Sequence, residues 1–203
     1  MKLWYSETSP YARKVRAVIA YHKLDGQIEF LEATSGLDKN SPHNRDNPLG
    51  RIPALQLNNG EWLYNSSLIA QYLNSLGTQP SLYLAGEAHW QALQLHYLAD
   101  GILENEIAVI PEKRLRPQNE WWLARHQQIF ERTAASLPAL YQAIQRFERE
   151  LNIGTLNAVC AIDFLRLREK FTQASRHPLI LELSQWSDEM NAKYPCLQQT
   201  RAQ

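Results

Sequence analysis

The sequence predicts two domains, an α/β unit of about 77 residues followed by an all-helical unit. Short runs of bulky apolar residues recur before residue 65, and such runs are typical of strands. After Pro80 no further strand pattern is found, and apolar residues recur at helical spacings of three and four. A turn-rich linker, Gly77–Ser81, separates the two patterns. We therefore expect one domain over residues 1–78 and a second over 84–203.

The α/β unit begins with a strand–helix–strand pattern. Lys2–Tyr5 is rich in bulky residues and is the first expected strand; the polar turn after it ends in Pro10, which suits the first position of a helix. An amphipathic pattern runs from Tyr11 to His22, and Asp25-Gly26 closes it. Ile28–Leu31 follows as the second strand. A helix between two strands at this length indicates a parallel βαβ unit.

A β-hairpin and a helix are expected to complete this unit. Ala54–Leu57 and Trp62–Tyr64 flank Asn58-Asn59-Gly60, which is a good hairpin turn sequence. Ser66 or Ser67 then serves as the N-cap of a helix. The apolar face of that helix holds Ile69, Tyr72, Leu73 and Leu76. The order of elements in the unit is therefore βαβ-ββα.

The second unit is expected to hold four main helices. Pro111 and Pro117 mark the end of the first of them, and Pro138 predicts a kink or a break in the second. The third contains the most apolar segment of the chain and is expected to be the central buried helix. The helices are expected at Glu87–Arg114, Glu120–Leu151 and Asn157–Phe171, and from His177-Pro178 through Met190.

Composition excludes several classes of protein. Lys plus Arg and Asp plus Glu are both 21, so no net charge favours nucleic acid or an anionic membrane. No segment approaches the ~20 apolar residues of a membrane span, and the first residues do not resemble a signal peptide. The cysteines, Cys160 and Cys196, have no spacing for metal or redox work. We expect a soluble protein of a reducing cytosol.

An X-Pro corner lies at the start of the expected hairpin. Residues 34–50 are polar and turn-rich, with at most a short helix, and they lead into Ile52-Pro53. Pro53 either only begins an edge strand or forms a cis peptide, because an X-Pro bond is where a cis peptide costs little. A cis bond would leave the N–H and C=O of Ile52 free to pair with an extended peptide.

Ser9 has two possible roles. It directly precedes Pro10 and is therefore the natural N-cap of the first helix. It also lies where N–H groups and the positive end of the helix dipole meet a ligand, so its hydroxyl could donate to a ligand thiolate. Both roles require the same position, and the sequence does not separate them.

Three segments together resemble the glutathione S-transferase superfamily, and the resemblance covers the whole chain. They are Thr8-Ser9-Pro10-Tyr11-Ala12-Arg13-Lys14-Val15-Arg16, Asn47-Pro48-Leu49-Gly50-Arg51-Ile52-Pro53-Ala54-Leu55 and Asn65-Ser66-Ser67-Leu68-Ile69-Ala70-Gln71-Tyr72-Leu73. The resemblance implies a thioredoxin-like N-terminal domain and a helical C-terminal domain. It also implies a homodimer that uses glutathione as co-substrate, without a metal.

The resemblance assigns roles at a glutathione site. Ser9 stands where serine-type members carry their activating serine, and Ile52 pairs with the cysteinyl part of glutathione beside a cis-proline, here Pro53. Ser66 matches the residue that holds the γ-glutamyl carboxylate with its own N–H at a helix start. Arg51 either supplies a cation for the glycyl carboxylate or is a solvated surface residue.

The chain departs from the family pattern at several positions. Asn65 stands where many members carry an acid; it accepts a hydrogen bond from the γ-glutamyl ammonium but brings no charge. Asp100 either replaces that charge across a dimer interface or is an exposed helix acid. Serine rather than cysteine at position 9 argues against a protein mixed disulfide. Cys160 three residues before Asp163 weakens the expected capping box of the buried helix.

A second-substrate pocket is expected between the first turn and the first long helix. Its candidate residues are Tyr5, Glu7, Tyr97, Arg114 and Trp122, although aromatic residues at helical spacing are more often core. His89 and His96 are interpreted as packing or surface residues rather than metal ligands.

Three functions remain open. We expect conjugation of glutathione to small electrophiles, with Ser9 stabilising the thiolate. One alternative is a non-catalytic protein that uses the same fold to bind partner proteins, which the uncharged Asn65 slightly favours. The other is glutathione-dependent peroxide reduction or isomerisation at the same site.

Overall fold

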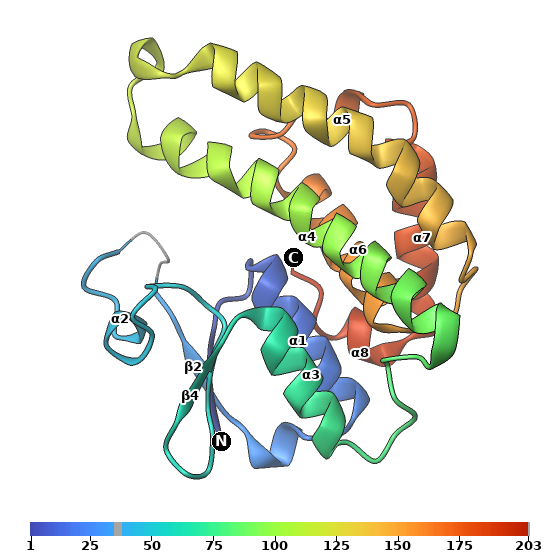
Figure 1. Cartoon of the computed structure of the whole chain (residues 1–203). Coiled ribbons are helices and arrows are strands. Elements are labelled where there is room, and N and C mark those ends of the chain that lie inside the picture. Colours follow the sequence, from blue (N-terminus) through green and yellow to red (C-terminus); the bar gives the residue numbers. More distant parts are fainter. Residues whose placement is uncertain (35–37, 203) are drawn as a thin grey trace. The chain divides into compact units, whose positions relative to one another are not determined.

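Strand β1 (Lys2–Tyr5) is an inner strand of a four-stranded sheet in the computed structural model, which describes residues 1–34 and 38–202 (Figure 1). It pairs in parallel with β2 (Glu29–Glu32) and antiparallel with β3 (Ala54–Gln56). β3 pairs antiparallel with β4 (Trp62–Tyr64), so the strand order is β2-β1-β3-β4. The expected parallel βαβ unit and the hairpin are both confirmed.

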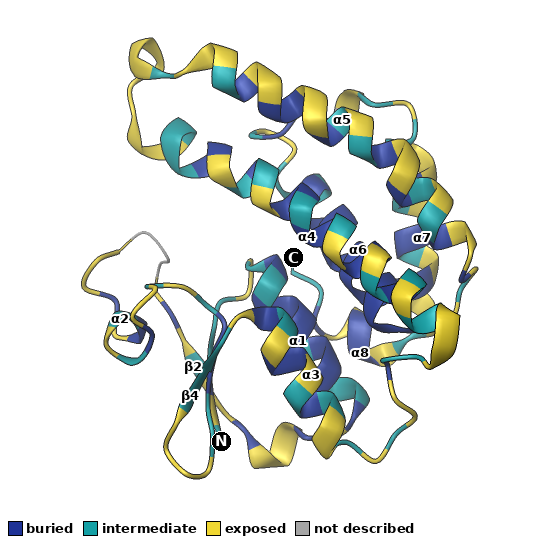
Figure 2. Ribbon diagram, viewed as in Figure 1, coloured by how far each residue is buried: buried dark blue, intermediate teal, exposed yellow. Residues whose placement is uncertain are grey.

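The two longest helices of this part of the fold are α1 (Pro10–Tyr21) and α3 (Ser66–Leu76). Helix α1 connects the parallel strands and packs against α3, and both bury an apolar face (Figure 2). The 3-10 turn η1 (Asp25–Gln27) leads into β2. The short helix α2 (His43–Asp46) agrees with the expectation of at most a short helix over residues 34–50, of which 35–37 lie outside the described part of the chain.

The N-cap of α3 differs from the expectation. Asn65, rather than Ser66 or Ser67, is the cap, and its Oδ1 accepts from the N–H groups of Ser67 at 2.8 Å and Leu68 at 3.4 Å. Two serines after an asparagine offer three possible caps, and spacing alone does not choose among them. Ser66 is consequently the first helical residue, which leaves its side chain available for other contacts.

The C-terminal part of the chain is helical, as expected. Its two longest helices both contain a proline, Pro111 and Pro138, and both continue through it. Helix α4 continues through Pro111 and ends one residue after the expected Arg114. The alternative of a break at Pro138 is wrong, because packing of the flanking apolar residues outweighs the lost hydrogen bond. The helices are α4 (Gly86–Leu115), α5 (Leu123–Gln145), α6 (Ile153–Leu167), α7 (Ile180–Lys193) and α8 (Pro195–Gln198), with 3-10 turns η2 (Gln118–Glu120) and η3 (Ala174–Arg176).

Helix α6 is the central buried helix, but it begins four residues earlier than expected. Asn152 is its N-cap, and Thr155 completes a capping box. Cys160 and Asp163 lie inside the helix, so the expectation of a weakened capping box at these two residues is wrong. The apolar run after Asn157 is more conspicuous in the sequence than the Asn-x-x-Thr pattern before it.

Two compact units make up the chain. One holds Met1–Tyr83 together with Pro195–Ala202, and the other holds Leu84–Tyr194. Helix α8 contacts α1 in the first unit, where an Arg13 Nη2 group donates to the Leu197 carbonyl at 3.3 Å. Across the described residues, no helix is long and apolar enough to span a membrane.

Candidate functional site

The register of the sheet brings the three motif segments to one edge. Ala54 pairs with Trp4 of β1 on one side and with Tyr64 of β4 on the other. Because these pairs are antiparallel, β1 and β4 end where β3 begins. The residues that leave the sheet there are Ser9, in the turn after β1, then Ile52-Pro53 before β3, and Asn65-Ser66 after β4.

Ser9 is the N-cap of α1. Its Oγ accepts a hydrogen bond from the Ala12 N–H at 3.2 Å, with Pro10 at the first helical position. The Ser9 hydroxyl proton has no acceptor among residues 1–34 and 38–202. The N-cap role is therefore confirmed, and it does not exclude the other role, because capping uses the oxygen lone pair and a ligand would receive the proton.

The Ile52–Pro53 peptide is cis, which confirms the second of the two alternatives for Pro53. Pro53 is buried and Ile52 is partly exposed. Neither the N–H nor the C=O of Ile52 is hydrogen-bonded to a described residue. An extended peptide can therefore pair with both groups in the manner of an added strand.

The loop before this corner is held by buried polar groups. Asn47, which is 1% exposed, donates through Nδ2 to the Arg51 carbonyl at 2.6 Å and accepts from the Leu49 N–H at 3.0 Å. Gly50 has a φ of +60°, and a Cβ there would meet the Asn44 Oδ1 at 3.0 Å. The Arg51 side chain is exposed and makes no ion pair within the described part of the chain.

The start of α3 presents two hydrogen-bond donors. Asn65 has φ +75° and ψ 121°, a sparsely populated conformation for a residue with a side chain. Its Oδ1 accepts the two hydrogen bonds of the cap. The expected hydrogen bond from a ligand ammonium group would have to go to the same oxygen. Ser66 is 7% exposed, and neither its N–H nor its hydroxyl proton has an acceptor among the described residues.

A lysine that the sequence analysis did not single out lies beside this helix start. The amphipathic pattern of α1 places Arg13 and Lys14 among its polar residues, yet they are only 4% and 0% exposed. The Lys14 Nζ donates to the Ser66 Oγ at 3.2 Å. The sequence signal for these two buried residues is a pair of adjacent cations inside an amphipathic helix. In the structure this helix packs against α3.

The candidates for the second-substrate pocket do not form one group. Tyr97 and Arg114 lie on the same helix 17 positions apart, which is about 25 Å along its axis. Tyr97 and Trp122 are 60% and 66% exposed, and the Arg114 guanidinium lies over the Phe171 ring at 5.1 Å. No cavity for a small molecule can therefore include both Tyr97 and Arg114.

The other two candidates, Tyr5 and Glu7, share one partner. The Arg16 guanidinium forms an ion pair with Glu7 at 3.0 Å and lies 5.0 Å from the centre of the Tyr5 ring. Burial, followed by the charges of Glu7 and Glu32, raises the pKa of the Tyr5 hydroxyl above its ordinary value. This cluster braces the turn that carries Ser9.

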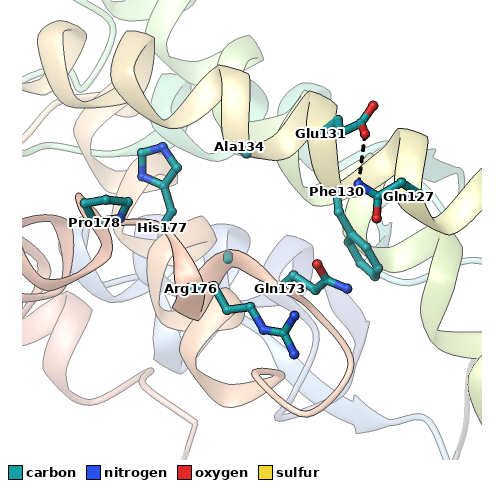
Figure 3. A pocket seen from close by; sticks show the side chains of 9 residues that line it. Gln127, Phe130, Glu131, Ala134, Gln173, Arg176, His177 and Pro178 are labelled. Carbon is teal, nitrogen blue, oxygen red and sulfur yellow. Dashed lines mark hydrogen bonds between the residues drawn. The ribbon is translucent and has the colours of Figure 1, made fainter.

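A cavity of about 230 Å³ lies in the helical unit between α5 and the η3 segment (Figure 3). The Gln127 side chain donates to Glu131 at 2.8 Å on its rim. None of the residues predicted for the site lines it. Its lining consists of Gln127, Phe130, Glu131, Ala134, Gln173, Ala174, Arg176, His177 and Pro178.

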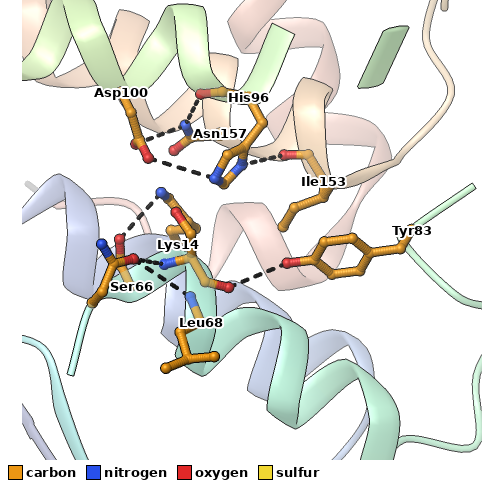
Figure 4. Close-up of polar contacts among 10 residues, drawn as sticks. Lys14, Ser66, Leu68, Tyr83, His96, Asp100, Ile153 and Asn157 are labelled. Carbon is orange, nitrogen blue, oxygen red and sulfur yellow. Dashed lines mark hydrogen bonds and ion pairs between the residues drawn. The ribbon is translucent and has the colours of Figure 1, made fainter. Parts of the chain in front are cut away.

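Asp100, proposed above to act across a dimer, is hydrogen-bonded within its own unit (Figure 4). It is 9% exposed, accepts from the Asn157 Nδ2 at 2.9 Å and lies 3.5 Å from the His96 Nε2. The default of an exposed acid is therefore wrong. His96 is a buried packing residue, and His89 contacts the Leu84 carbonyl at 3.0 Å.

The protein cysteines are buried. Burial raises the pKa of the Cys196 thiol to about 11, so this thiol is neutral at physiological pH. Cys160 is 1% exposed inside α6. Within residues 1–34 and 38–202, no group of three metal-ligating side chains is found.

Residues 8–76 match the family model of the glutathione S-transferase N-terminal domain. The chain is 26% identical over 178 residues to the uncharacterized GST-like protein YibF of Escherichia coli (strain K12), covering 83% of each chain. It is 38% identical over 86 residues, 40% of each chain, to maleylacetoacetate isomerase of Pseudomonas aeruginosa.

A solved structure of a glutathione transferase family member from Pseudomonas fluorescens Pf-5 resembles the whole chain. With bound glutathione, that protein superposes with a TM-score of 0.89 at 29% identity, covering 100% of this chain and 98% of that one. The same protein has also been solved with bound S-(propanoic acid)-glutathione, at a TM-score of 0.84. The likeness extends over both units of the fold.

Proposed function

Because this chain belongs to the glutathione S-transferase superfamily, we propose that it binds glutathione and conjugates the thiolate to small electrophiles. The observation that carries the proposal is the set of unengaged polar groups at one edge of the sheet. These groups are the hydroxyl proton of Ser9 at the start of α1, the backbone N–H and C=O of Ile52 before β3, and the two donors of Ser66 at the start of α3.

Glutathione has the shape and charges that these groups would bind. Its extended backbone pairs with the N–H and C=O of Ile52 beside Pro53. Its γ-glutamyl carboxylate lies at the start of α3, where the N–H and hydroxyl of Ser66 donate to it. The exposed Arg51 guanidinium balances the glycyl carboxylate, and Asn65 lies beside the γ-glutamyl ammonium.

This arrangement directs the thiol toward Ser9, where the thiolate is stabilised. A thiol with a pKa of ~8.5 is mostly protonated at neutral pH, and lowering the pKa by ~2 units requires roughly 2.7 kcal/mol of preference for the thiolate. One hydrogen bond to a charged partner contributes about 1.5–3 kcal/mol, and the end of a helix adds ~0.3–1 kcal/mol. The Ser9 hydroxyl and α1 together are sufficient.

The chemical step is a nucleophilic attack by the bound thiolate. Its sulfur lone pair forms a C–S bond with the electrophilic carbon, and the leaving group departs with the electron pair of the bond that breaks. Where the electrophile is an activated alkene, no group leaves and the resulting carbanion takes a proton from water. The protein supplies position and thiolate stabilisation, and no protein cysteine takes part.

Isomerisation is a second candidate, favoured by the similarity of part of the chain to maleylacetoacetate isomerase. The same thiolate would add to an activated double bond, rotation would follow, and elimination would return free glutathione. The two functions differ in their products, because conjugation consumes glutathione whereas isomerisation leaves its concentration unchanged.

Conjugation of an aryl halide by the wild-type protein and by Ser9→Ala tests the proposal. We expect glutathione binding in both and a roughly 10–100-fold lower kcat/KM in Ser9→Ala, the ratio for one lost charge-assisted hydrogen bond. Ser9→Thr, which keeps the hydroxyl, is the matched control. Equal turnover in wild type and Ser9→Ala would remove Ser9 from the mechanism, and absence of glutathione binding would favour a protein that binds partner proteins.

A further inference from the structure

We infer that Lys14 is a positioning residue that orients the Ser66 hydroxyl toward an anionic group, the α-carboxylate of the γ-glutamyl residue. The inference rests on the proposed binding of glutathione. It adds Lys14 to the residues that the sequence analysis assigned to the glutathione site. Lys14 lies on α1, five positions after its N-cap, and Ser66 is the first residue of α3.

The Lys14 and Ser66 side chains, from α1 and α3, meet in a hydrogen bond (Figure 4). Lys14 is 0% exposed, its Nζ lies 3.2 Å from the Ser66 Oγ, and it is 5.7 Å from the centre of the Tyr11 ring. Ser66 itself is 7% exposed. An ammonium group removed from water is costly unless it is paired, so its place in the fold requires partners such as this oxygen.

The chemistry of the pair determines the direction of one proton. A lysine ammonium has three donors and no acceptor, so in this contact the Ser66 oxygen accepts. The Ser66 proton must therefore point away from Lys14, and it has no acceptor among the described residues. The contact converts a hydroxyl that can donate or accept into one that is oriented to donate.

The two donors of Ser66 favour a ligand group that carries negative charge. The Ser66 hydroxyl and N–H are two donors on one residue at the positive end of α3, and the Lys14 cation is hydrogen-bonded to that hydroxyl. Asn65 engages the next two N–H groups of the helix, so Ser66 is the residue left to receive a ligand. A carboxylate uses both donors and the charge, whereas a neutral group would use only the donors.

A purely structural role for Lys14 predicts different behaviour. If Lys14 only holds α1 against α3, its loss would weaken binding of every thiol peptide alike and lower kcat together with affinity. A positioning role predicts a loss confined to ligands that carry the α-carboxylate. It also leaves the pH dependence of kcat unchanged, because Ser9 rather than Ser66 faces the thiol.

The test compares two ligands in each variant. One is glutathione, and the other is 4-aminobutanoyl-cysteinylglycine, which lacks only the α-carboxylate. We expect Lys14→Met to weaken glutathione binding by about tenfold, raising KM with little change in kcat, and to leave affinity for the analogue unchanged. Lys23→Met, which removes an exposed lysine just after the same helix, is the matched control and should bind both ligands as wild type does.

The outcomes separate the inference from the function on which it rests. If wild type fails to bind glutathione, the proposed function falls and the inference falls with it. If wild type binds glutathione but Lys14→Met weakens both ligands equally, the function stands and the positioning role is wrong.

An experiment on the wild-type protein covers the case in which Lys14→Met does not fold. In protein labelled with ¹⁵N-lysine, the Lys14 ammonium resonance should shift when glutathione is added and stay in place when the analogue is added. A resonance that responds identically to both ligands would overturn the inference.

Discussion

The first residues of the helices carry similar polar side chains in the two units, but the number of their hydrogen-bonding groups that remain without a partner differs. At α6, the Asn152 Oδ1 accepts from the Gly154 and Thr155 N–H groups at 2.9 and 3.0 Å. The Thr155 hydroxyl accepts from the Asn152 N–H at 2.9 Å and donates to the Glu150 carbonyl at 2.8 Å. Of these polar side-chain groups, only the Asn152 amide nitrogen lacks a partner among the described residues.

The starts of α1 and α3 leave more groups unengaged. Ser9 accepts one hydrogen bond and keeps its proton, and Ser66 keeps both its N–H and its hydroxyl proton. A helix start in which the polar groups satisfy one another stabilises the fold. One that retains donors at the edge of a sheet is suited to bind a ligand. The difference predicts which substitutions change stability and which change binding.

Breaking the closed cap should have the largest effect on stability. Asn152→Ala leaves two N–H groups without their acceptor in the interior, and we expect a loss of about 2–3 kcal/mol of unfolding free energy. Chemical denaturation measures it. Thr155→Val removes only the hydroxyl and should cost less. Glutathione affinity of the folded fraction should remain that of wild type in both variants, and a change in affinity with unchanged stability would contradict the distinction between the two kinds of helix start.

Glu106 provides a third case, because its carboxylate has no hydrogen-bond partner within the described residues and is too deeply buried to reach a ligand. It lies on α4 and is 0% exposed. Burial raises the pKa of the Glu106 carboxyl above its ordinary value, and the charge of the Lys113 ammonium opposes this shift to a lesser extent. The protein therefore holds this proton more tightly when folded.

The sign of the pH effect follows from that difference in pKa. Glu106 costs no stability at a pH below 4.5, and its cost grows as the pH rises through the elevated folded-state pKa. We expect Glu106→Gln to raise the unfolding free energy by about 1–2 kcal/mol at pH 7, with the gain shrinking toward pH 4. Denaturation midpoints across this range measure it. An equal gain at every pH would show that Glu106 does not titrate in this way.

The smallest effect is expected at the open start of α3. Asn65→Asp keeps the cap and adds a negative charge beside the proposed position of the γ-glutamyl ammonium. We expect about threefold tighter glutathione binding and a gain of ~0.5 kcal/mol in stability from the helix dipole. Calorimetric titration measures the affinity, with glutaryl-cysteinylglycine, which lacks the ammonium, as the control ligand. Equal tightening for both ligands would show that the added charge does not act on the ammonium.

Short-range sequence patterns predict most of the secondary structure of the first unit and less of that of the second. The turn at Asn58-Asn59-Gly60 and the proline at position 10 act within a few residues, so the hairpin and the start of α1 were predicted correctly. The cis bond before Pro53 was one of two alternatives, because the isomer depends on the surrounding fold.

Contacts between distant residues could not be inferred in the same way. The hydrogen bond between Lys14 of α1 and Ser66 of α3 joins two residues that are 52 positions apart in sequence. The start of α6 at Ile153 was missed because its capping residues precede a stronger apolar signal. The second-substrate candidates share no motif, so nothing in the sequence excluded a set that includes two residues 17 positions apart on α4.

The pKa of the glutathione thiol in the bound complex tests the central role of Ser9 most directly. It can be followed by ultraviolet thiolate absorbance in wild type and in Ser9→Gly, which removes the hydroxyl while costing the cap only a few tenths of a kcal/mol. We expect a bound thiol pKa of about 6.5 in wild type and a rise of ~1–2 units in Ser9→Gly, with little change in stability. The same thiol pKa in both proteins would contradict the account.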